Sequence, residues 1–538
     1  MAKTNSLNDF LIDLATTIRT EENSDKLISP KNFPNKIPLF GKRLEAPTEK
    51  LQNILGVYEN VVSDPDDDSN IDEEVDSEKV YEGMEGVTEL LTDVANSIRT
   101  EEGSTELINP QSFSERIVNF GNTLKGQNKS LESTVGAYIN PITYGVKLDK
   151  AIQTGTDWAS YTDDAEGLEG AYMDFTNDTF VDNGWLNRWP FNEIKPCLMK
   201  NNQVVGYLNP NDYSKFEDGT DSNINNLTLE ENGFVMIEIP KIYYHISRDD
   251  NYVYIKISNI EQDGFVCKAH TYKGAVLDKL YISAYLCGAS SGTVLDQTLG
   301  FITSSGASLS TGVVMSYKLH WDNLQNLHGN RYEMLPYNVS LLIGYLFAIM
   351  FKSTNSQLSL GYSYTTKLTE HTVGQLDQKG MYYGKDKNSN FGVKFLGMED
   401  LYGVREQITT GFYVYQSIPK YIDVSNPNSS YSPTEIGNYL SSEKEFIIGS
   451  KYSRSTIDIN EDAINVGLWG REVSTTYTKG FCDSLNITSN STGTTLNSTV
   501  YGVSGSTRDF FGIFAQQLVQ ASQTSKVRSL RVVYYPQL

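Results

Sequence analysis

The chain of 538 residues carries 67 acidic and 44 basic side chains, which gives a formal net charge of -23. Such a length exceeds what one hydrophobic core usually spans, so we expect several domains. The negative charge repels phosphate backbones and anionic lipid surfaces, which argues against a nucleic-acid partner. The start MAKTNSLNDF has no apolar segment after a basic stretch, so we expect no secretory signal and folding in a cytoplasm.

A duplicated pattern opens the chain: IRTEENSDKLISPKNF, from Ile18, returns as IRTEEGSTELINPQSF, from Ile98. The apolar residues before each copy recur at spacings of three and four, which is typical of an amphipathic helix. Ser29 and Asn109 each precede a proline, which predicts the N-cap and first position of a second short helix. The apolar residues that we expect to mediate assembly are Leu11, Leu14, Ile18 and Phe33 in the first copy and Leu91, Val94, Ile98 and Phe113 in the second.

An acidic stretch, SDPDDDSNIDEEVDSEK from Ser63 to Lys79, separates the two copies and predicts a flexible spacer. An EF-hand loop starting at Asp64 would need Gly at its sixth position and Glu at its twelfth, where the chain has Ser69 and Val75. Calcium is therefore not favoured here. The expected organisation is repeat 1 over 1–60, the linker over 61–85, repeat 2 over 86–140, a connector over 141–185 and a C-terminal domain over 186–538.

The repeats predict a partner, because two or three short helices with one apolar face do not form a stable core alone. Each repeat should pack against its twin, another subunit or a larger protein; a small helical domain without a partner is the other interpretation. The repeat resembles the LxxIAxAIRxKxGxxxxINPxxFxxxI repeat of tailed-bacteriophage virion proteins. The resemblance implies attachment to other virion proteins or oligomerisation, with a homotrimer as the expected state.

Beyond about Tyr144, turn-rich segments with many aromatic residues favour strands. GFVMIEIPKIYYHIS, followed by YVYIKISN, predicts a hairpin with its turn at RDDN, and Pro240 implies an edge strand or a bulge. The run LLIGYLFAIMF, from Leu341 to Phe351, is shorter than the roughly 20 residues that cross a bilayer and predicts one buried helix. The alternation in KVRSLRVVYYPQL predicts a final strand.

Several ordered blocks of this region resemble the C-type-lectin-like domain of phage tail-fibre proteins: KPCLMKNNQVVGYLNPNDYSKFEDGT, VMIEIPKIYYHIS, DGFVCKAH, YISAYLCG and LGMEDLYGVREQITTGFYV. That family shares its fold with phage tropism determinants and, more remotely, with formylglycine-generating enzymes. The block GMEDLYGVREQ stands where the wider fold often has GNVWEW, and it lacks those tryptophans. The expected fold class is α+β multidomain, with helical repeats followed by a strand- and loop-rich, C-type-lectin-like domain around a buried helix.

No motif for catalysis, a metal or a cofactor is present, so we expect neither an enzyme nor a cofactor. HExxH, GxGxxG and Walker patterns are all missing. The four cysteines, Cys197, Cys267, Cys287 and Cys482, lie far apart and are expected to be free thiols, and a copper-binding pair like that of formylglycine-generating enzymes is absent. Two carboxylates could still converge in space to form a glycosidase. The loop EDGTDSN, Glu217 to Asn223, is interpreted as a solvated turn rather than a calcium site.

In tropism determinants of this fold, the ligand surface precedes the final strand, and here the matching stretch is Val466 to Gly512. Aromatic side chains there can stack on sugars, and arginines can bind carboxylate or phosphate groups. Alternatively, Trp469 belongs to the core, the arginines are structural braces, or the stretch contacts a neighbouring subunit. The candidate ligand-binding residues are Trp469, Arg471, Tyr477, Tyr501 and Arg508.

Together the two resemblances predict a bacteriophage virion protein of tail-fibre or receptor-binding type, synthesised in a host cytoplasm. Its C-terminal domain would bind a host-surface glycan or protein, and its repeats would bind other virion proteins. One alternative is a head fibre, baseplate or capsid decoration protein with a purely structural role. A second alternative is a polysaccharide depolymerase, which would need two carboxylates in one cleft. No membrane insertion is expected.

Overall fold

A computed structural model describes the chain within residues 141–537. Its longer gaps are 151–157, 225–232, 288–307, 310–320, 364–370, 388–390, 433–438 and most of 443–527. The chain divides into two units, Met1–Gly126 and Gln127–Leu538, and every described residue belongs to the second, whose described part we call the body. Both predicted repeats, the acidic linker and all eight candidate assembly residues lie outside the described residues.

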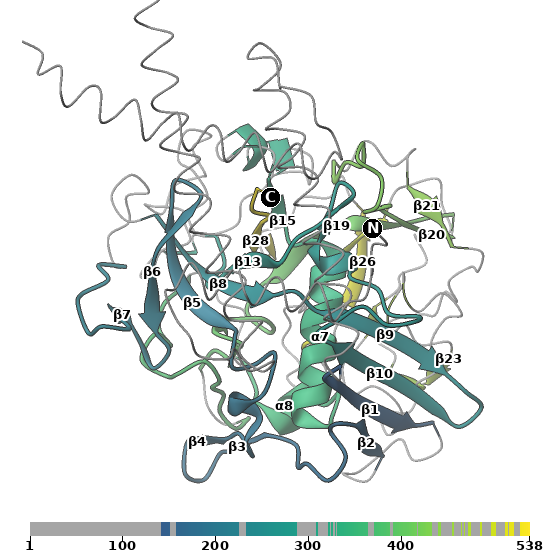
Figure 1. The fold of residues 1–538 in the computed structure, drawn as a ribbon, viewed down its shortest axis with the longest axis horizontal. Helices are drawn as coiled ribbons and strands as arrows, with labels where there is room; N and C mark the ends of the chain where they lie inside the picture. The colour runs from purple at the N-terminus through teal and green to yellow at the C-terminus, as the bar shows by residue number, and fades with distance from the viewer. Residues whose placement is uncertain are drawn as a thin grey trace, which may run out of the picture. The chain divides into compact units, whose positions relative to one another are not determined.

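Helix α7 (Tyr337–Phe351) runs through the middle of the body (Figure 1). All 15 of its residues are buried, so the helix is enclosed on every side, as its uninterrupted apolar sequence requires. The helix begins after Pro336, where no N–H donor is needed, and ends at Lys352 in the left-handed conformation. The predicted buried helix at 341–351 is confirmed, and it begins four residues earlier, at Tyr337. A short helix follows, α8 (Ser356–Ser359), capped by the side chain of Asn355.

An antiparallel sheet packs against one side of α7 (Figure 1). The hydroxyl of Tyr161 in this sheet donates to the carbonyl of Ile349 in the helix at 2.7 Å. Because β1 is an interior strand, the segment 141–185 is part of the body, and the domain boundary predicted at residue 186 falls inside it. The strand order is β2 (Ala159–Asp163), β1 (Thr143–Asp149), β10 (Tyr252–Ser258) and β9 (Tyr243–Arg248).

The hairpin predicted at RDDN is confirmed, with β9 and β10 paired antiparallel. Asp249 forms its turn by accepting hydrogen bonds from the backbone N–H groups of Asn251 and Tyr252, at 2.8 and 2.7 Å. The prediction for Pro240 is wrong, because the strand β8 that contains it is interior. Pro240 is the last residue of β8, where the chain leaves one sheet for the other, so its missing N–H interrupts no further pairing.

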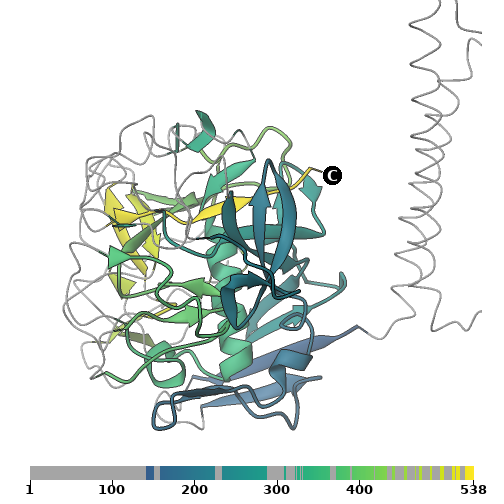
Figure 2. The same cartoon turned by 90° about the vertical axis from the view of Figure 1, so that its left-hand side faces the viewer.

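A second, larger sheet contains β8 and the last strand of the chain (Figure 2). The final strand is confirmed as β28 (Val532–Tyr534), and it lies between β15 and β13 rather than at an edge. Both of its faces are buried, since Val532 and Tyr534 pack in one apolar cluster and Val533 packs in another. The order is β15 (Tyr332–Met334), β28, β13 (Lys279–Ser283), β8 (Phe234–Pro240), β5 (Lys195–Lys200), β6 (Gln203–Asn209) and β7 (Asp212–Phe216).

The remaining described strands form a third sheet and several two-stranded pairs. In the third sheet β27 (Arg528–Ser529) pairs with β19, and the other strands follow the order β21 (Leu440–Ser441), β20 (Ile418–Tyr421), β19 (Glu406–Tyr415), β25 (Asn497–Tyr501), β26 (Gln516–Gln520) and β24 (Leu485–Asn486). The pairs are β3 (Tyr172–Asp174) with β4 (Thr179–Val181), β11 (Thr271–Tyr272) with β12 (Ala275–Val276), β14 (Ser308–Leu309) with β16 (His371–Thr372), β17 (Lys394–Phe395) with β18 (Met398–Glu399), and β22 (Arg454–Thr456) with β23 (Glu472–Ser474). Two short 3-10 helices complete the body, η2 (Trp185–Asn187) and η3 (Lys268–His270). The body is thus rich in strands, as predicted.

Arg531, directly before β28, is a fully buried cation that joins three distant segments. Its guanidinium donates to the carbonyls of Ser283 and Ala284, at 2.6 and 3.1 Å, and to the carbonyl of Glu399 at 2.5 Å. Its Nε donates to Oε1 of Gln407 at 2.8 Å. The planar fork of arginine supplies these donors in fixed directions, which lysine cannot reproduce.

Replacing Arg531 with methionine should lower the free energy of unfolding by about 3–5 kcal/mol, because four buried acceptors lose their donor. Arg531→Lys should cost less, since one charged donor remains. All five tryptophans lie between residues 158 and 469, so urea unfolding of the full chain followed by tryptophan fluorescence reports on the second unit. The exposed control Lys387→Met should change little. A loss below about 1 kcal/mol for Arg531→Met would contradict this role.

Candidate functional site

Four of the five candidate ligand-binding residues, Trp469, Arg471, Tyr477 and Arg508, lie outside the described residues. The fifth, Tyr501, is the last residue of β25, an interior strand of the third sheet. Its Cα partners are Gln407 in β19 and Gln516 in β26. A ligand role for all five residues stays a prediction.

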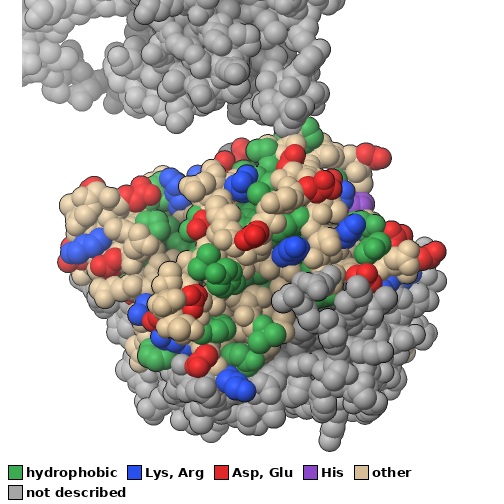
Figure 3. All heavy atoms as spheres, turned by 90° about the horizontal axis from the view of Figure 1, so that it is seen from below, with side chains coloured by type: hydrophobic (Ala, Val, Ile, Leu, Met, Phe, Trp, Pro, Cys, Tyr) green, Lys and Arg blue, Asp and Glu red, His purple; other side chains and the backbone are tan. Residues whose placement is uncertain are grey.

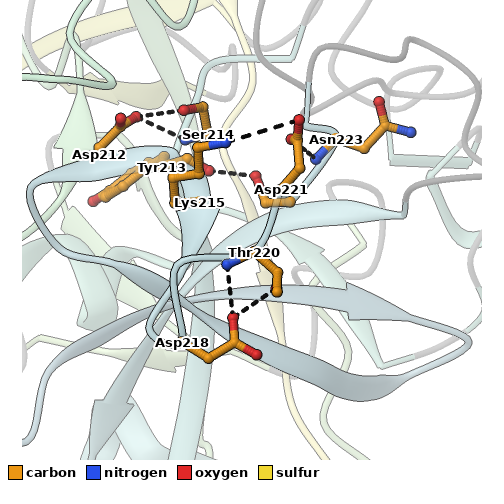
Figure 4. A network of polar contacts seen from close by, with 9 residues as sticks. Asp212, Tyr213, Ser214, Lys215, Asp218, Thr220, Asp221 and Asn223 are labelled. Carbon is orange, nitrogen blue, oxygen red and sulfur yellow. Dashed lines mark hydrogen bonds and ion pairs between the residues drawn. The ribbon is translucent and has the colours of Figure 1, made fainter.

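The acidic loop around residues 212–223 forms turns with its own side chains (Figure 4). Asp218 accepts hydrogen bonds from the N–H and the hydroxyl of Thr220, at 2.9 and 2.6 Å, and these bonds lower the pKa of Asp218. Asp212 and Asp221 each accept a hydrogen bond from the backbone N–H of the residue two positions after them. Within the described ranges, no group of three or more His, Cys, Asp or Glu side chains is placed to hold a metal ion. These local hydrogen bonds form turns, which agrees with the interpretation of residues 217–223 as a solvated turn.

The described cysteines are free thiols, as predicted. Burial raises the pKa of Cys267 to about 12, and it raises the pKa of Cys287 to about 12 as well. Burial also raises the pKa of Cys197. The thiolate is the reactive form of cysteine, so these thiols are chemically inert at neutral pH.

The described surface carries an open groove of about 670 Å³, a volume within the range of small-molecule sites. We call it the β3–β4 groove, because the hairpin of β3 and β4 forms one side. The other sides of the groove are formed by three stretches of the chain, 186–195, 210–217 and 378–383. Figure 3 views the body from the side on which β3 and β4 lie in Figure 1, and it shows charges of both signs interspersed with small hydrophobic groups. Its lining includes Asp178, Phe180, Leu186, Asn192, Lys195, Asn211, Glu217, Gln378, Lys379, Met381, Tyr382 and Tyr383.

Aromatic stacking anchors the floor of the groove to the core. The rings of Phe180 and Tyr382 are stacked, with centroids 4.7 Å apart and planes 12° apart. Phe180 also meets Phe351, the last residue of α7, edge to face at 6.0 Å. Phe180 is only half-buried, and Leu186 is 38% exposed, so the groove presents an apolar surface that is held in place from beneath.

Charged side chains line the groove beside this apolar surface. Lys385 Nζ lies 2.6 Å from Oδ1 of Asp178, and this hydrogen bond raises the pKa of Lys385. The hydroxyl of Tyr383 donates to Oδ2 of Asp178 at 3.4 Å. Lys379 Nζ lies 5.0 Å from the centroid of the Tyr383 ring, within cation–π range. Across the groove Lys195 and Glu217 form a looser ion pair at 4.0 Å.

A buried polar cluster beneath the groove holds the loop 374–383. Lys394 Nζ donates to the carbonyl of Leu376 at 2.9 Å and lies 3.6 Å from the centroid of the Tyr213 ring. The carboxylate of Glu399 accepts the N–H groups of Gly374 and Gln375, at 2.8 and 3.2 Å. Burial lowers the pKa of Lys394 to about 8. The loop therefore reaches the groove in a fixed shape, which reduces the ordering cost of binding.

The hydroxyl of Tyr285 adds a further bond to this cluster by donating to Asp377. Sequence reasoning missed the cluster. The available signal was the pair Glu399–Asp400 between apolar Met398 and Leu401, because carboxylates in an apolar stretch are buried only where partners satisfy them.

Glu333 is a second buried carboxyl with a shifted pKa, but it belongs to the core and not to the groove. Its two oxygens accept hydrogen bonds from Trp321 Nε1 at 2.9 Å and from the Tyr272 hydroxyl at 3.2 Å. Burial raises the pKa of Glu333 to about 8, and these two bonds oppose the shift without cancelling it. Glu333 is therefore mostly protonated at neutral pH.

Glu333 should make stability fall as pH rises. The folded state keeps the proton up to pH about 8, whereas the unfolded state releases it near 4.5, so this group costs up to about 1.4 kcal/mol per pH unit between those values. Glu333→Gln, which mimics the protonated form, should match the parent chain near pH 5 and exceed it at pH 8. Urea unfolding at both pH values tests this, with the groove-rim variant Glu217→Gln as control. A stability difference that does not change with pH would refute the assignment.

No model of a known protein family matches this sequence, and no curated protein matches it. In the part of the chain that the structure describes, no helix has the length and apolar character needed to cross a bilayer.

Proposed function

We propose that this chain is a bacteriophage virion protein of tail-fibre or receptor-binding type that recognises the host surface without catalysis. Its repeats would bind other virion proteins or assemble the chain into an oligomer, and its C-terminal domain would have the C-type-lectin-like fold. Display of several copies would raise the avidity of weak individual contacts. The ligand would be a glycan or a protein on the host surface.

The β3–β4 groove is the observation that carries this proposal. It combines a stacked aromatic floor with amide groups and charges at the rim, the mixture that recognises ligands with both apolar faces and polar edges. Its two lining carboxylates are each ion-paired with a lysine, Asp178 with Lys385 and Glu217 with Lys195. Because a lysine engages each of these carboxylates, neither is left unpaired to act on a glycosidic bond, so recognition is favoured over the depolymerase alternative.

A purely structural role in a head fibre, baseplate or capsid is the remaining alternative. The all-round burial of α7 and of β28 would serve a rigid structural block equally well. The two roles differ in what the free chain does, because a structural protein needs no affinity for cells.

The fluorescently labelled full chain should bind intact cells of the host bacterium, and binding should fall about tenfold or more in the variant Tyr477→Ala, Tyr501→Ala, Arg508→Ala. Flow cytometry measures the bound chain. Asp278→Asn, a change of an exposed side chain outside the stretch 466–512, serves as control. If the folded parent chain binds no cells while antibodies place it within the particle, the structural alternative replaces this proposal. If the parent binds and the triple variant binds equally, host contact lies elsewhere on the body.

A further inference from the structure

We infer that the β3–β4 groove binds an acidic saccharide, with Lys379 as the partner of the sugar carboxylate. This inference rests on the proposed recognition function and names the ligand class of one site.

One lysine of the groove, Lys379, is available to pair with an anionic group of a ligand. Lys385 is paired with Asp178, and Lys195 is paired with Glu217. Lys379 contacts the Tyr383 ring and has no ion pair with any carboxylate of the described residues. The lining itself holds two lysines and two carboxylates, and because Lys385, outside the lining, pairs with Asp178, Lys379 is the lining lysine left without a carboxylate. A carboxylate of a ligand could therefore pair with Lys379 without displacing an existing ion pair.

The rest of the lining matches a saccharide rather than a bare inorganic anion. Phe180, Leu186 and Met381 provide an apolar surface for the C–H face of a sugar ring. Asn192, Asn211 and Gln378 stand at the rim, and each carries both a hydrogen-bond donor and an acceptor. Hydroxyl groups of sugars both donate and accept, so amides are suitable partners. A volume of about 670 Å³ leaves room for more than one sugar ring.

The loop that carries Lys379 and Gln378 is fixed before any ligand arrives. Glu399 accepts hydrogen bonds from the backbone N–H groups of Gly374 and Gln375. Lys394 donates one to the carbonyl of Leu376. The backbone N–H of Lys379 donates to the carbonyl of Leu376 at 3.1 Å, which closes the turn. The ammonium group of Lys379 therefore lies beside the Tyr383 ring on a loop whose backbone is fixed.

The experiment compares acidic and neutral sugars by saturation-transfer NMR and titration of the full chain. The acidic probes are glucuronate, galacturonate, N-acetylneuraminate and a glucuronate-containing tetrasaccharide, and the neutral probes are glucose, galactose, N-acetylglucosamine and the carboxyl-reduced tetrasaccharide. At least one acidic probe should bind more tightly than its neutral counterpart. Lys379→Gln should weaken that binding about tenfold or more, as expected for a lost charge-assisted bond.

Two further variants separate the groove from the rest of the surface. The double change Asn192→Ala, Gln378→Ala alters exposed side chains and should also weaken binding, whereas Lys387→Gln, exposed but outside the lining, should leave it unchanged. Binding of neutral probes alone, no binding of any probe, or acidic binding that survives both groove variants would each overturn the inference. Cell binding by the parent chain is measured in parallel: if cells are bound and these sugars are not, the ligand class is wrong while the recognition function stands.

Discussion

The buried guanidinium of Arg531 is the interaction on which the arrangement of the body depends. It joins the segment before β28 to the carbonyls of Ser283 and Ala284, at the end of β13, and to the hairpin of β17 and β18. A cation of this kind is tolerated in a core only when its donors are satisfied, and here acceptors from three separate segments meet at its position. Correct placement of the last residues is therefore a condition for closing the core around α7.

The same region connects the core to the groove. Glu399 offers its backbone carbonyl to Arg531 and its carboxylate to the N–H groups of Gly374 and Gln375. Lys394, its cross-strand partner, holds the next carbonyl of that loop. One buried polar cluster thus stabilises the last strand on one side and shapes a surface loop on the other. Polar clusters of this type define a single arrangement because any half-satisfied alternative is costly.

Recognition and attachment are divided along the chain in the proposed function. The duplicated pattern before residue 140 accounts for assembly, and the body accounts for contact with the host. Under this proposal the groove would add a site far in sequence from the stretch before the final strand, and the body would offer two surfaces to a cell. A second, weak saccharide contact would lengthen residence on a glycan-covered surface before tighter binding occurs.

Local patterns alone determined several elements of this protein. An unbroken apolar run predicted α7, Asp249 in RDDN predicted the β9–β10 turn, and alternation predicted β28, since periodicity and turn chemistry act over a few residues. Tertiary structure decided the rest. Strand order decides that β1 is an interior strand and that Pro240 lies where the chain passes from one sheet to the other. It also brings together the four acceptors of Arg531. The β3–β4 groove, which draws Phe180, Lys195 and Lys379 from distant segments, follows from that order, because neighbours across sheets leave no mark in the local sequence.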